Sequence, residues 1–243
     1  MGQVAGNIIG SGTGLKSRIK RLPIVGKVAQ WLARASKPLR IRFAHFDSSS
    51  YWDSRYAKGG NSGDGSYGEL AKFKAGILNE FVAENHVASV IEFGCGDGSQ
   101  LSLAQYPQYV GLDVSPAALR RCLHLFRGDV TKSFQRYGEL EPNVLRAELV
   151  LSLDVIFHLV EDNVYERYMR DVFKAATRFV IIYSDDVEAP RDLLHVRHRK
   201  FSDWVDHHRP DWRLIRHIPN NFPWEAETER GSFSDFWIYE KSH

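Results

Sequence analysis

The feature that most constrains the fold is a short apolar strand that runs directly into closely spaced glycines. Residues 88–93 read Ala-Ser-Val-Ile-Glu-Phe, and residues 94–98 read Gly-Cys-Gly-Asp-Gly. Glycines let the backbone turn tightly and let a ligand approach the N–H groups. In open α/β sheets, ligands bind beyond the carboxyl ends of the strands. The segment therefore predicts the first strand of such a sheet with a binding loop at its end, and residues 99–103 read as the start of a helix whose N-terminus favours negative charge.

Strand and helix patterns alternate along the chain after this point. Further strands are predicted at 109–113, 148–153 and 179–183, and helices at 69–84, 116–126 and 163–176, with Ser115 as an N-cap. This alternation indicates a mostly parallel sheet with helices on both faces. A short helix at 200–207 is followed by strands at 212–218 and 235–240, a pair that fits an antiparallel edge on the same sheet.

Residues 1–46 differ in charge from the rest of the chain. They hold nine Lys or Arg and no Asp or Glu, so the remaining residues carry −7 of the total charge of +2. Apolar residues at helical spacing over 15–39, broken at Pro23, predict a basic amphipathic helix or helix pair. We expect an extension (1–46) and one domain (47–243) that begins with an aromatic and glycine-rich segment (47–68). The extension either packs on the domain or contacts an anionic membrane surface or a protein partner.

The location expected from the sequence is the cytoplasm, including the inner face of the membrane. Two cysteines, Cys95 and Cys122, cannot form a disulfide framework. No stretch reaches the roughly 18 apolar residues of a membrane span, and the amino terminus lacks a secretory apolar core.

A carboxylate follows the glycine segment at an informative spacing. Asp113 ends the second predicted strand, nineteen residues after Gly94. A spacing of about 20 residues brings a carboxylate to the hydroxyls of a bound ribose in nucleotide-binding α/β folds. The alternative is a solvated Asp at a strand end.

The acidic residue Glu92 followed by GxGxG resembles the first motif of the class I S-adenosylmethionine-dependent methyltransferases, and the resemblance covers about residues 68–243. It implies a Rossmann-like sheet of seven strands whose last strand, 235–240, is antiparallel, and S-adenosylmethionine as the cofactor. It further implies that Glu92 holds the methionine amino group through its surroundings and that Asp113 takes the ribose. The cofactor-binding residues predicted on this basis are Tyr51, Gly60, Glu92, Gly94, Cys95, Gly96, Asp113, Val114, Asp129, Val130 and Leu153.

Two further segments enter through the same resemblance. Gly128-Asp129-Val130 matches the family's next element, where Asp129 would bond the adenine amine; the alternative is a turn residue. Residues 51–63 resemble a segment of bacterial members associated with surface-polysaccharide gene clusters. This implies a loop that closes over the site, with hydroxyls from Tyr51 and Tyr56 and a hinge at Gly59 and Gly60. The alternative is an N-terminal packing segment.

The segment after the fourth strand is the predicted catalytic region. Methyl transfer from a sulfonium to a hydroxyl requires alignment of donor and nucleophile and removal of a proton. His158 is the candidate base because its ordinary pKa is near 6.5. Asp154 is expected to position His158 or the acceptor, and a structural histidine is the alternative.

Basic residues after the fifth strand are the predicted substrate site. His195, Arg197, His198 and Arg199, with Arg191 and Lys200 beside them, could hold an anionic group of the acceptor. The alternative is a solvated basic face that offsets nearby acidic residues. No carboxylate is spaced with His195, His198, His207 and His208 to complete a metal site, so no metal is predicted, and Trp204 or Trp224 could orient the acceptor.

The sequence therefore predicts a methyltransferase that acts on an oxygen of a sugar, a glycan or another polar or anionic small molecule. The N-methyltransferase signature, Asn or Asp before Pro-Pro-Tyr, is absent after the fourth strand. Nucleic acid is not an expected partner, and the oligomeric state is left open. The alternatives are a catalytically silent scaffold that binds a membrane or protein partner, and a nicotinamide-dependent oxidoreductase.

Overall fold

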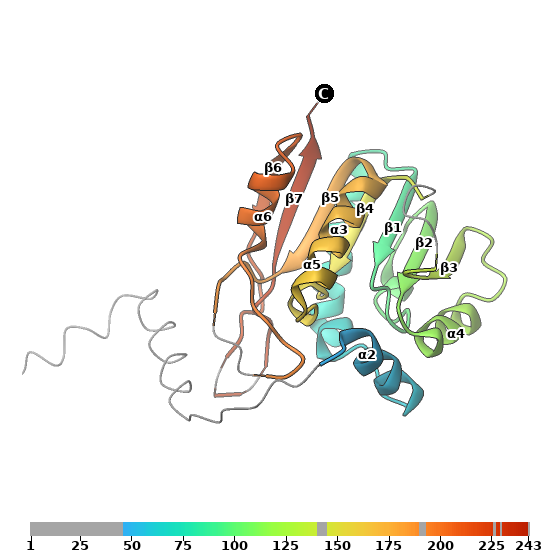
Figure 1. The fold of residues 1–243 in the computed structure, drawn as a ribbon. Coiled ribbons are helices and arrows are strands. Elements are labelled where there is room, and N and C mark those ends of the chain that lie inside the picture. Colours follow the sequence, from blue (N-terminus) through green and yellow to red (C-terminus); the bar gives the residue numbers. More distant parts are fainter. Residues whose placement is uncertain (1–45, 140–144, 190–192, 226, 229, 243) are drawn as a thin grey trace, which may run out of the picture. The chain divides into compact units, whose positions relative to one another are not determined.

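Seven strands form one mixed sheet in the part of the chain that the computed structural model describes, residues 46–139, 145–189, 193–225, 227–228 and 230–242 (Figure 1). The strand order is β3-β2-β1-β4-β5-β7-β6; β1 to β5 are parallel, and β7 runs antiparallel to both β5 and β6. This confirms the predicted Rossmann-like sheet with its antiparallel seventh strand. The strands are β1 (Ser89–Phe93), β2 (Gln108–Asp113), β3 (Lys132–Arg136), β4 (Ala147–Leu153), β5 (Ala176–Ser184), β6 (Trp212–Ile218) and β7 (Asp235–Lys241).

Helices cover both faces of the sheet, because the central strands are apolar on both sides. Alternate residues of β1, such as Val90 and Ile91, belong to two different apolar cores. One core includes side chains of α5 (Asp162–Ala175) and α6 (Phe201–His208), and the other includes side chains of α3 (Gly68–Glu84) and α4 (Pro116–Leu125). As predicted, Ser115 caps α4, where its hydroxyl accepts from the Ala118 amide at 3.3 Å.

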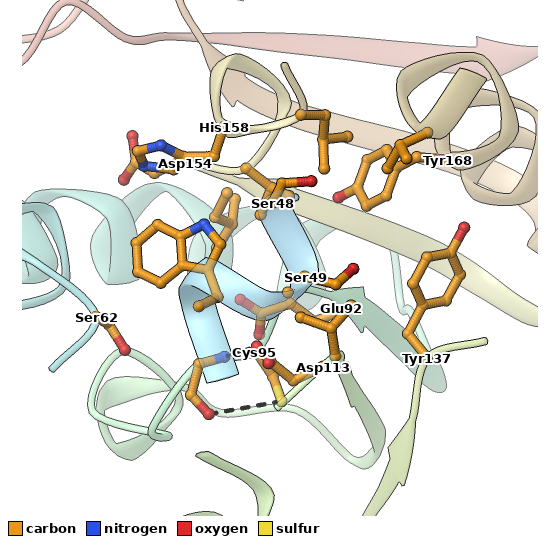
Figure 2. Close-up of a pocket in the computed structure, with 18 of the residues that line it drawn as sticks. Ser48, Ser49, Ser62, Glu92, Cys95, Asp113, Tyr137, Asp154, His158 and Tyr168 are labelled. Carbon is orange, nitrogen blue, oxygen red and sulfur yellow. Dashed lines mark hydrogen bonds between the residues drawn. The ribbon is translucent and has the colours of Figure 1, made fainter. Parts of the chain in front are cut away.

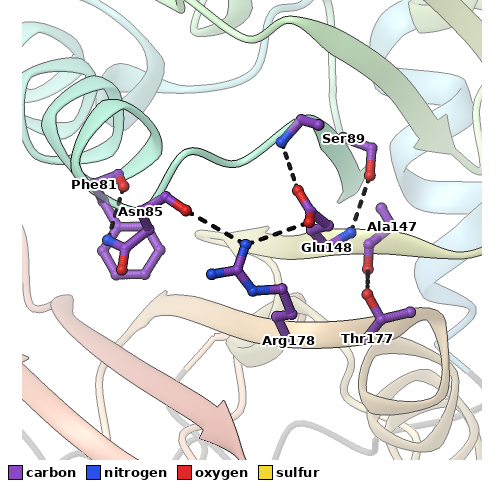
Figure 3. A network of polar contacts seen from close by, with 8 residues as sticks. Phe81, Asn85, Ser89, Ala147, Glu148, Thr177 and Arg178 are labelled. Carbon is purple, nitrogen blue, oxygen red and sulfur yellow. Dashed lines mark hydrogen bonds and ion pairs between the residues drawn. The ribbon is translucent and has the colours of Figure 1, made fainter.

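The amino ends of the strands are closed by a polar network (Figure 3). The carboxylate of Glu148 accepts from the Ala88 amide at 2.6 Å and lies 3.3 Å from a guanidinium nitrogen of Arg178. Arg178 also donates to the Asn85 carbonyl, and the Ser89 hydroxyl accepts from the Glu148 amide. These contacts tie β1, β4, β5 and the end of α3 together at the edge opposite the glycine loop.

Residues 47–68 are not the continuous loop that their Gly, Ser and Asp content predicts. They contain a helix, α2 (Ser48–Ala57), and a short 3-10 helix, η2 (Asp64–Ser66). Asp47 caps α2 by accepting from the Ser50 amide at 2.6 Å, and Glu161 accepts from the amide and the hydroxyl of Ser48, both at 2.8 Å. The distant carboxylate of Glu161 thus satisfies a first-turn amide, a tertiary contact that local composition does not reveal.

Two other elements differ from expectation. The glycine loop is followed by turns and a 3-10 helix, η3 (Leu101–Leu103), and not by an α-helix. No α-helix N-terminus therefore follows this loop to favour negative charge there. In addition, β3 has no counterpart among the predicted strands, because its sequence, Lys-Ser-Phe-Gln-Arg, is polar and only partly buried at the sheet edge.

The predicted basic helix of residues 15–39 lies outside the described residues, as does nearly all of the extension. Among the helices that are described, none is long and apolar enough to cross a bilayer.

Candidate functional site

A cavity of about 270 Å³ lies at the carboxyl ends of β1, β2 and β4 (Figure 2). Its size is just below the roughly 300–1,000 Å³ of ordinary small-molecule sites. Its walls come from the glycine loop, from the ends of these strands, and from α2, α3 and α5. The predicted site residues that line it are Glu92, Gly94, Cys95, Gly96, Asp113, Val114, Leu153, Asp154 and His158.

The glycine loop turns sharply at the end of β1. Gly94 has φ +84°, and a β-carbon there would lie 2.5 Å from Cγ2 of Val155. The amides of Gly94 and Cys95 both donate to the Leu112 carbonyl, at 2.7 and 3.0 Å, which anchors the loop to β2. Glycine is required at position 94 both by its backbone conformation and by the close approach of Val155.

Asp113 lies in direct contact with this loop. One carboxylate oxygen accepts from the Gly96 amide at 3.0 Å, and the other accepts from the Ser115 amide at 2.8 Å. The side chain is buried, and burial raises the pKa of its carboxyl to about 6, against the opposing effect of these hydrogen bonds. The two elements that are nineteen residues apart in the sequence thus form one rigid wall of the cavity.

Glu92 and Lys74 are two buried ionisable groups that also line the cavity. Glu92 accepts from the Tyr109 hydroxyl at 2.7 Å, and burial raises the pKa of its carboxyl to about 7 although Tyr109 and the positive charge of Lys74 oppose this. Lys74 is only 1% exposed, and its Nζ lies 2.7 Å from Oδ2 of Asp154. Sequence reasoning missed Lys74, because a single Lys within an amphipathic helix is typical of a solvated position.

Asp154 is held in a left-handed backbone conformation, with φ +57°. Its amide donates to the Tyr183 carbonyl at 2.8 Å, and its other carboxylate oxygen, Oδ1, accepts from the Ser234 hydroxyl at 2.9 Å. Such strain persists only where the surroundings determine it and is concentrated at functional sites. The expectation that Asp154 positions His158 is corrected, because the partners of this carboxylate are Lys74 and Ser234.

His158 lies in the short 3-10 helix η4 (Ile156–His158) and is positioned by a backbone carbonyl. Its Nδ1 is 2.9 Å from the carbonyl oxygen of His195, so this nitrogen carries the proton and Nε2 is free of one. Burial lowers the pKa of His158 to about 4, and the ring of Trp52 lies 4.7 Å away in an edge-on arrangement. At neutral pH the side chain is therefore a neutral imidazole that can accept a proton at Nε2.

The segment that contains α2 covers the glycine loop. Ser62 and Asp97 exchange two hydrogen bonds, in which the Asp97 amide donates to the Ser62 hydroxyl at 3.0 Å and the Ser62 amide donates to the Asp97 carboxylate at 3.2 Å. The hydroxyl of Tyr56 lies 2.9 Å from that of Ser62, and Tyr56 lines the cavity as predicted for a covering segment. Tyr51 and Gly60 are not among the lining residues: Tyr51 stacks on His195 at 5.0 Å, and the Gly60 carbonyl accepts from Arg121 at 2.5 Å.

The structure contradicts the placement of Asp129 and Val130 at the cofactor site. They precede β3, which is parallel to β2, so they lie at the amino edge of the sheet while the cavity lies at the carboxyl edge. Asp129 accepts from the amide and hydroxyl of Thr131 at 3.0 and 2.6 Å, and these bonds lower its pKa in an exposed turn. The turn alternative therefore describes Asp129. The cavity is also lined by six residues that sequence reasoning missed. Two follow β3, which went unrecognised, and four lie on α5: Tyr137, Gly138, Asn163, Val164, Arg167 and Tyr168.

The predicted substrate-binding cluster is engaged with the protein itself. Arg197 and Arg199 both pair with Asp162, at 2.8 and 3.1 Å, and both donate to the Val160 carbonyl. His198 is hydrogen-bonded to the Asp185 carboxylate. Neither these three residues nor His195 line the cavity. The described contacts of Arg197, His198 and Arg199 are thus with the protein itself, and Arg191 lies outside the described residues.

Neither of the two tryptophans considered for orienting the acceptor lines the cavity. Trp204 is buried in the core and donates to Glu166 at 2.9 Å, while Trp224 stacks on Phe233 at 5.1 Å and does not line the cavity. Over the described ranges, no group of three or more His, Cys, Asp or Glu side chains is arranged to hold a metal ion.

Comparison with known proteins identifies the fold. No protein-family model matches the sequence, and a search of curated proteins finds no match. Among solved structures, the N-methyltransferase NodS of Bradyrhizobium japonicum WM9 in complex with S-adenosyl-L-homocysteine matches with TM-score 0.61 and 11% identity, over 82% of this chain and 100% of that one. The magnesium protoporphyrin IX methyltransferase ChlM of Synechocystis PCC 6803 with bound SAM matches with TM-score 0.56 and 16% identity, over 82% and 99%. The methyltransferase domain of bacterial CtHen1 matches with TM-score 0.55 and 17% identity, over 70% and 97%. The fold is that of the class I S-adenosylmethionine-dependent methyltransferases.

Proposed function

We propose that this protein is a methyltransferase that binds S-adenosylmethionine in the cavity at the carboxyl ends of β1, β2 and β4. The observation that carries the proposal is the contact between Asp113 and the glycine loop. It places a buried, backbone-oriented carboxylate beside a loop that carries no side chain at Gly94 or Gly96. Ionised, such a carboxylate can accept from both hydroxyls of a ribose.

The residues present fit this cofactor. Gly94 and Gly96 line the cavity at the sharp turn after β1, where β-carbons would meet Val155 and Ser62. Asp113 provides an acceptor for the ribose, and Glu92 and the residues around it provide acceptors for the amino group. When bound, S-adenosylmethionine supplies an electrophilic methyl group on a sulfonium. The part of the chain is to align an acceptor with that methyl, exclude water and take the proton that the acceptor loses.

The acceptor that we propose is a hydroxyl of a polar small molecule such as a sugar or glycan. His158 supports this proposal, because it lines the same cavity and its Nδ1 donates to the His195 carbonyl, which leaves Nε2 as the unprotonated nitrogen. An anionic acceptor has less support, since Arg197 and Arg199 are already paired with Asp162. NodS is an N-methyltransferase and ChlM a magnesium protoporphyrin IX methyltransferase, so neither indicates a sugar acceptor and the proposal rests on the side chains of this chain. Incubation with radiolabelled cofactor and a panel of nucleotide sugars, glycans and phenols tests it; label in N-nucleophiles only would contradict it.

Substitution of the two aspartates tests the cofactor site. We expect Asp113→Ala to weaken binding of S-adenosylhomocysteine roughly 10- to 100-fold, because a charge-assisted hydrogen bond contributes about 1.5–3 kcal/mol. Asp129→Ala, the same change in an exposed turn at the opposite edge, should leave binding unchanged. Isothermal titration calorimetry measures both. An unchanged affinity for Asp113→Ala, in a protein whose thermal unfolding remains cooperative, would show that the ribose assignment is wrong.

A further inference from the structure

Lys74 presents a buried ammonium group to the proposed cofactor cavity. It is 1% exposed on α3 and lines the cavity together with Glu92, Gly94 and Asp154. A lysine is almost never this deeply buried unless its charge is paired. A fixed positive charge beside a small-molecule cavity therefore needs an explanation.

The described contacts of Lys74 satisfy only part of its hydrogen-bonding capacity. An ammonium group has three N–H donors. Among the residues that the structure describes, Lys74 donates to Oδ2 of Asp154 at 2.7 Å, and its other polar contact is the face of the Tyr183 ring, at 5.1 Å from the ring centroid. Lys74 can therefore donate further hydrogen bonds to a ligand. An anionic acceptor suits it best, because hydrogen bonds between charged groups are stronger than those between neutral groups.

The placement of Lys74 along the sheet indicates which part of a ligand it meets. The strand order β2-β1-β4 places Asp113, the glycine loop and Asp154 in succession along the carboxyl edge. Neighbouring strands are about 4.8 Å apart, so Asp113 and the Lys74–Asp154 pair lie roughly 10 Å apart. A ribose held by Asp113 directs the rest of S-adenosylmethionine across the glycine loop toward Glu92 and Lys74.

Glu92 and Lys74 together offer a hydrogen-bond acceptor and a cationic donor, which complement the two polar groups of an α-amino acid. The carboxyl of Glu92 accepts from Tyr109 and is close enough to Lys74 to sense its charge. An amino acid end of a ligand has an ammonium and a carboxylate on one carbon. A carboxyl acceptor and an ammonium donor that line the same cavity can distinguish these groups.

We propose that Lys74 binds the carboxylate of the methionine end of the cofactor, and thereby selects ligands with an intact amino acid over nucleosides that lack it. The inference rests on the proposed function and adds a specificity-determining residue to it. Asp154 keeps one donor of Lys74 and fixes the direction of the ammonium, and its own orientation is held by Ser234 and the Tyr183 carbonyl. The competing explanation is that Lys74 serves only to hold Asp154 in its strained conformation.

A ligand pair distinguishes these explanations. S-adenosylhomocysteine carries the carboxylate, and 5′-methylthioadenosine lacks the whole amino acid. For Lys74→Met we expect affinity for S-adenosylhomocysteine to fall roughly 10- to 100-fold while affinity for methylthioadenosine changes less than about twofold. A purely structural role would weaken both ligands equally or neither, and either result would overturn the proposal. Calorimetry on the full chain measures all four affinities.

Lys72→Met is the matched control, because Lys72 lies on the same helix, is 68% exposed in its side chain and forms an exposed ion pair with Glu69. It should bind both ligands as the unmodified protein does. If Lys74→Met loses its cooperative thermal transition, Lys74→Gln, which keeps a donor for Asp154, replaces it with the same expectation. The unmodified protein gives an independent reading: it should prefer S-adenosylmethionine over its decarboxylated form by at least 10-fold, and equal affinities would refute the carboxylate subsite. Failure of methylthioadenosine and S-adenosylhomocysteine alike to bind the unmodified protein would instead refute the proposed function.

Discussion

At the scale of single residues, His158 links the chemistry of the cavity to stability. The pKa of its ring is lowered to about 4 by burial, whereas an unfolded histidine titrates near 6.5. Between these values the unfolded chain binds a proton that the folded protein does not, so stability falls as the pH falls through this window. The same burial keeps Nε2 unprotonated at neutral pH, but it makes His158 a weaker base than the ordinary histidine on which the sequence-based assignment rested.

We therefore expect His158→Phe to reduce the loss of stability on acidification. Between pH 7.5 and pH 5, His158 should account for about 2 kcal/mol of that loss. Urea denaturation of both proteins at the two pH values measures it. His124→Phe, a change at an exposed position of α4, is the control and should lose stability on acidification as the unmodified protein does. Equal acid sensitivity of His158→Phe and the unmodified protein would show that His158 is not held neutral.

The proximity of two residues could be predicted from the sequence where both lie at the same end of neighbouring parallel strands. Gly94 and Asp113 end strands that pair in parallel register, so their proximity follows from the strand pattern. Lys74 could not be predicted, because its burial depends on contacts with Asp154 and Tyr183, which are distant in sequence. Asp129 was placed at the wrong edge, because a three-residue match does not reveal which end of β3 it occupies.

At the scale of elements, α2 and the glycine loop depend on each other. A β-carbon at Gly96 would clash with the Ser62 hydroxyl and lie 2.9 Å from the Tyr56 hydroxyl, and the φ of +57° disfavours any other residue. The absence of a side chain at position 96 therefore leaves room for the covering segment.

Gly96→Ala should accordingly loosen the covering segment. We expect the amides of α2 to exchange with solvent at least 10-fold faster, because Tyr56 and Ser62 must move, while β4 and β5 retain their protection. Hydrogen exchange with mass spectrometry measures this. Gly76→Ala, on α3 where a β-carbon meets nothing within 4 Å, is the control and should stabilise the protein by up to about 1 kcal/mol. Unchanged exchange in Gly96→Ala would contradict the coupling.

The elements that were mispredicted share one physical cause. α2 and β3 have polar sequences, and each is held by contacts made elsewhere, such as that of Glu161 with Ser48 and the pairing of β3 with β2. The buried strands β1, β4 and β5 were predictable because apolar runs of that length have few alternatives. The central strands could thus be predicted from local sequence pattern, whereas the edge strand β3 and the helix α2 depend on tertiary contacts that the pattern does not show.

At the scale of the whole molecule, the cavity joins segments from most of the described chain. Its walls come from α2, α3, α5 and the ends of three central strands, and Asp154 connects them to Ser234 just before β7. A ligand that fills this cavity contacts elements on both faces of the sheet. Unfolding of the domain must therefore release the ligand, so binding adds to global stability by mass action.

This coupling separates the proposed function from its two alternatives. At a concentration 100 times its dissociation constant, S-adenosylhomocysteine should add about 2.7 kcal/mol to the free energy of unfolding. For a protein of this size that corresponds to a rise in Tm of roughly 5–10 °C, which differential scanning calorimetry resolves. NAD is not a ligand under the proposed function, so it should leave Tm unchanged. A rise in Tm with NAD alone would favour an oxidoreductase. No rise with either ligand would favour a silent scaffold, because a cavity that binds neither ligand gains no stability from them.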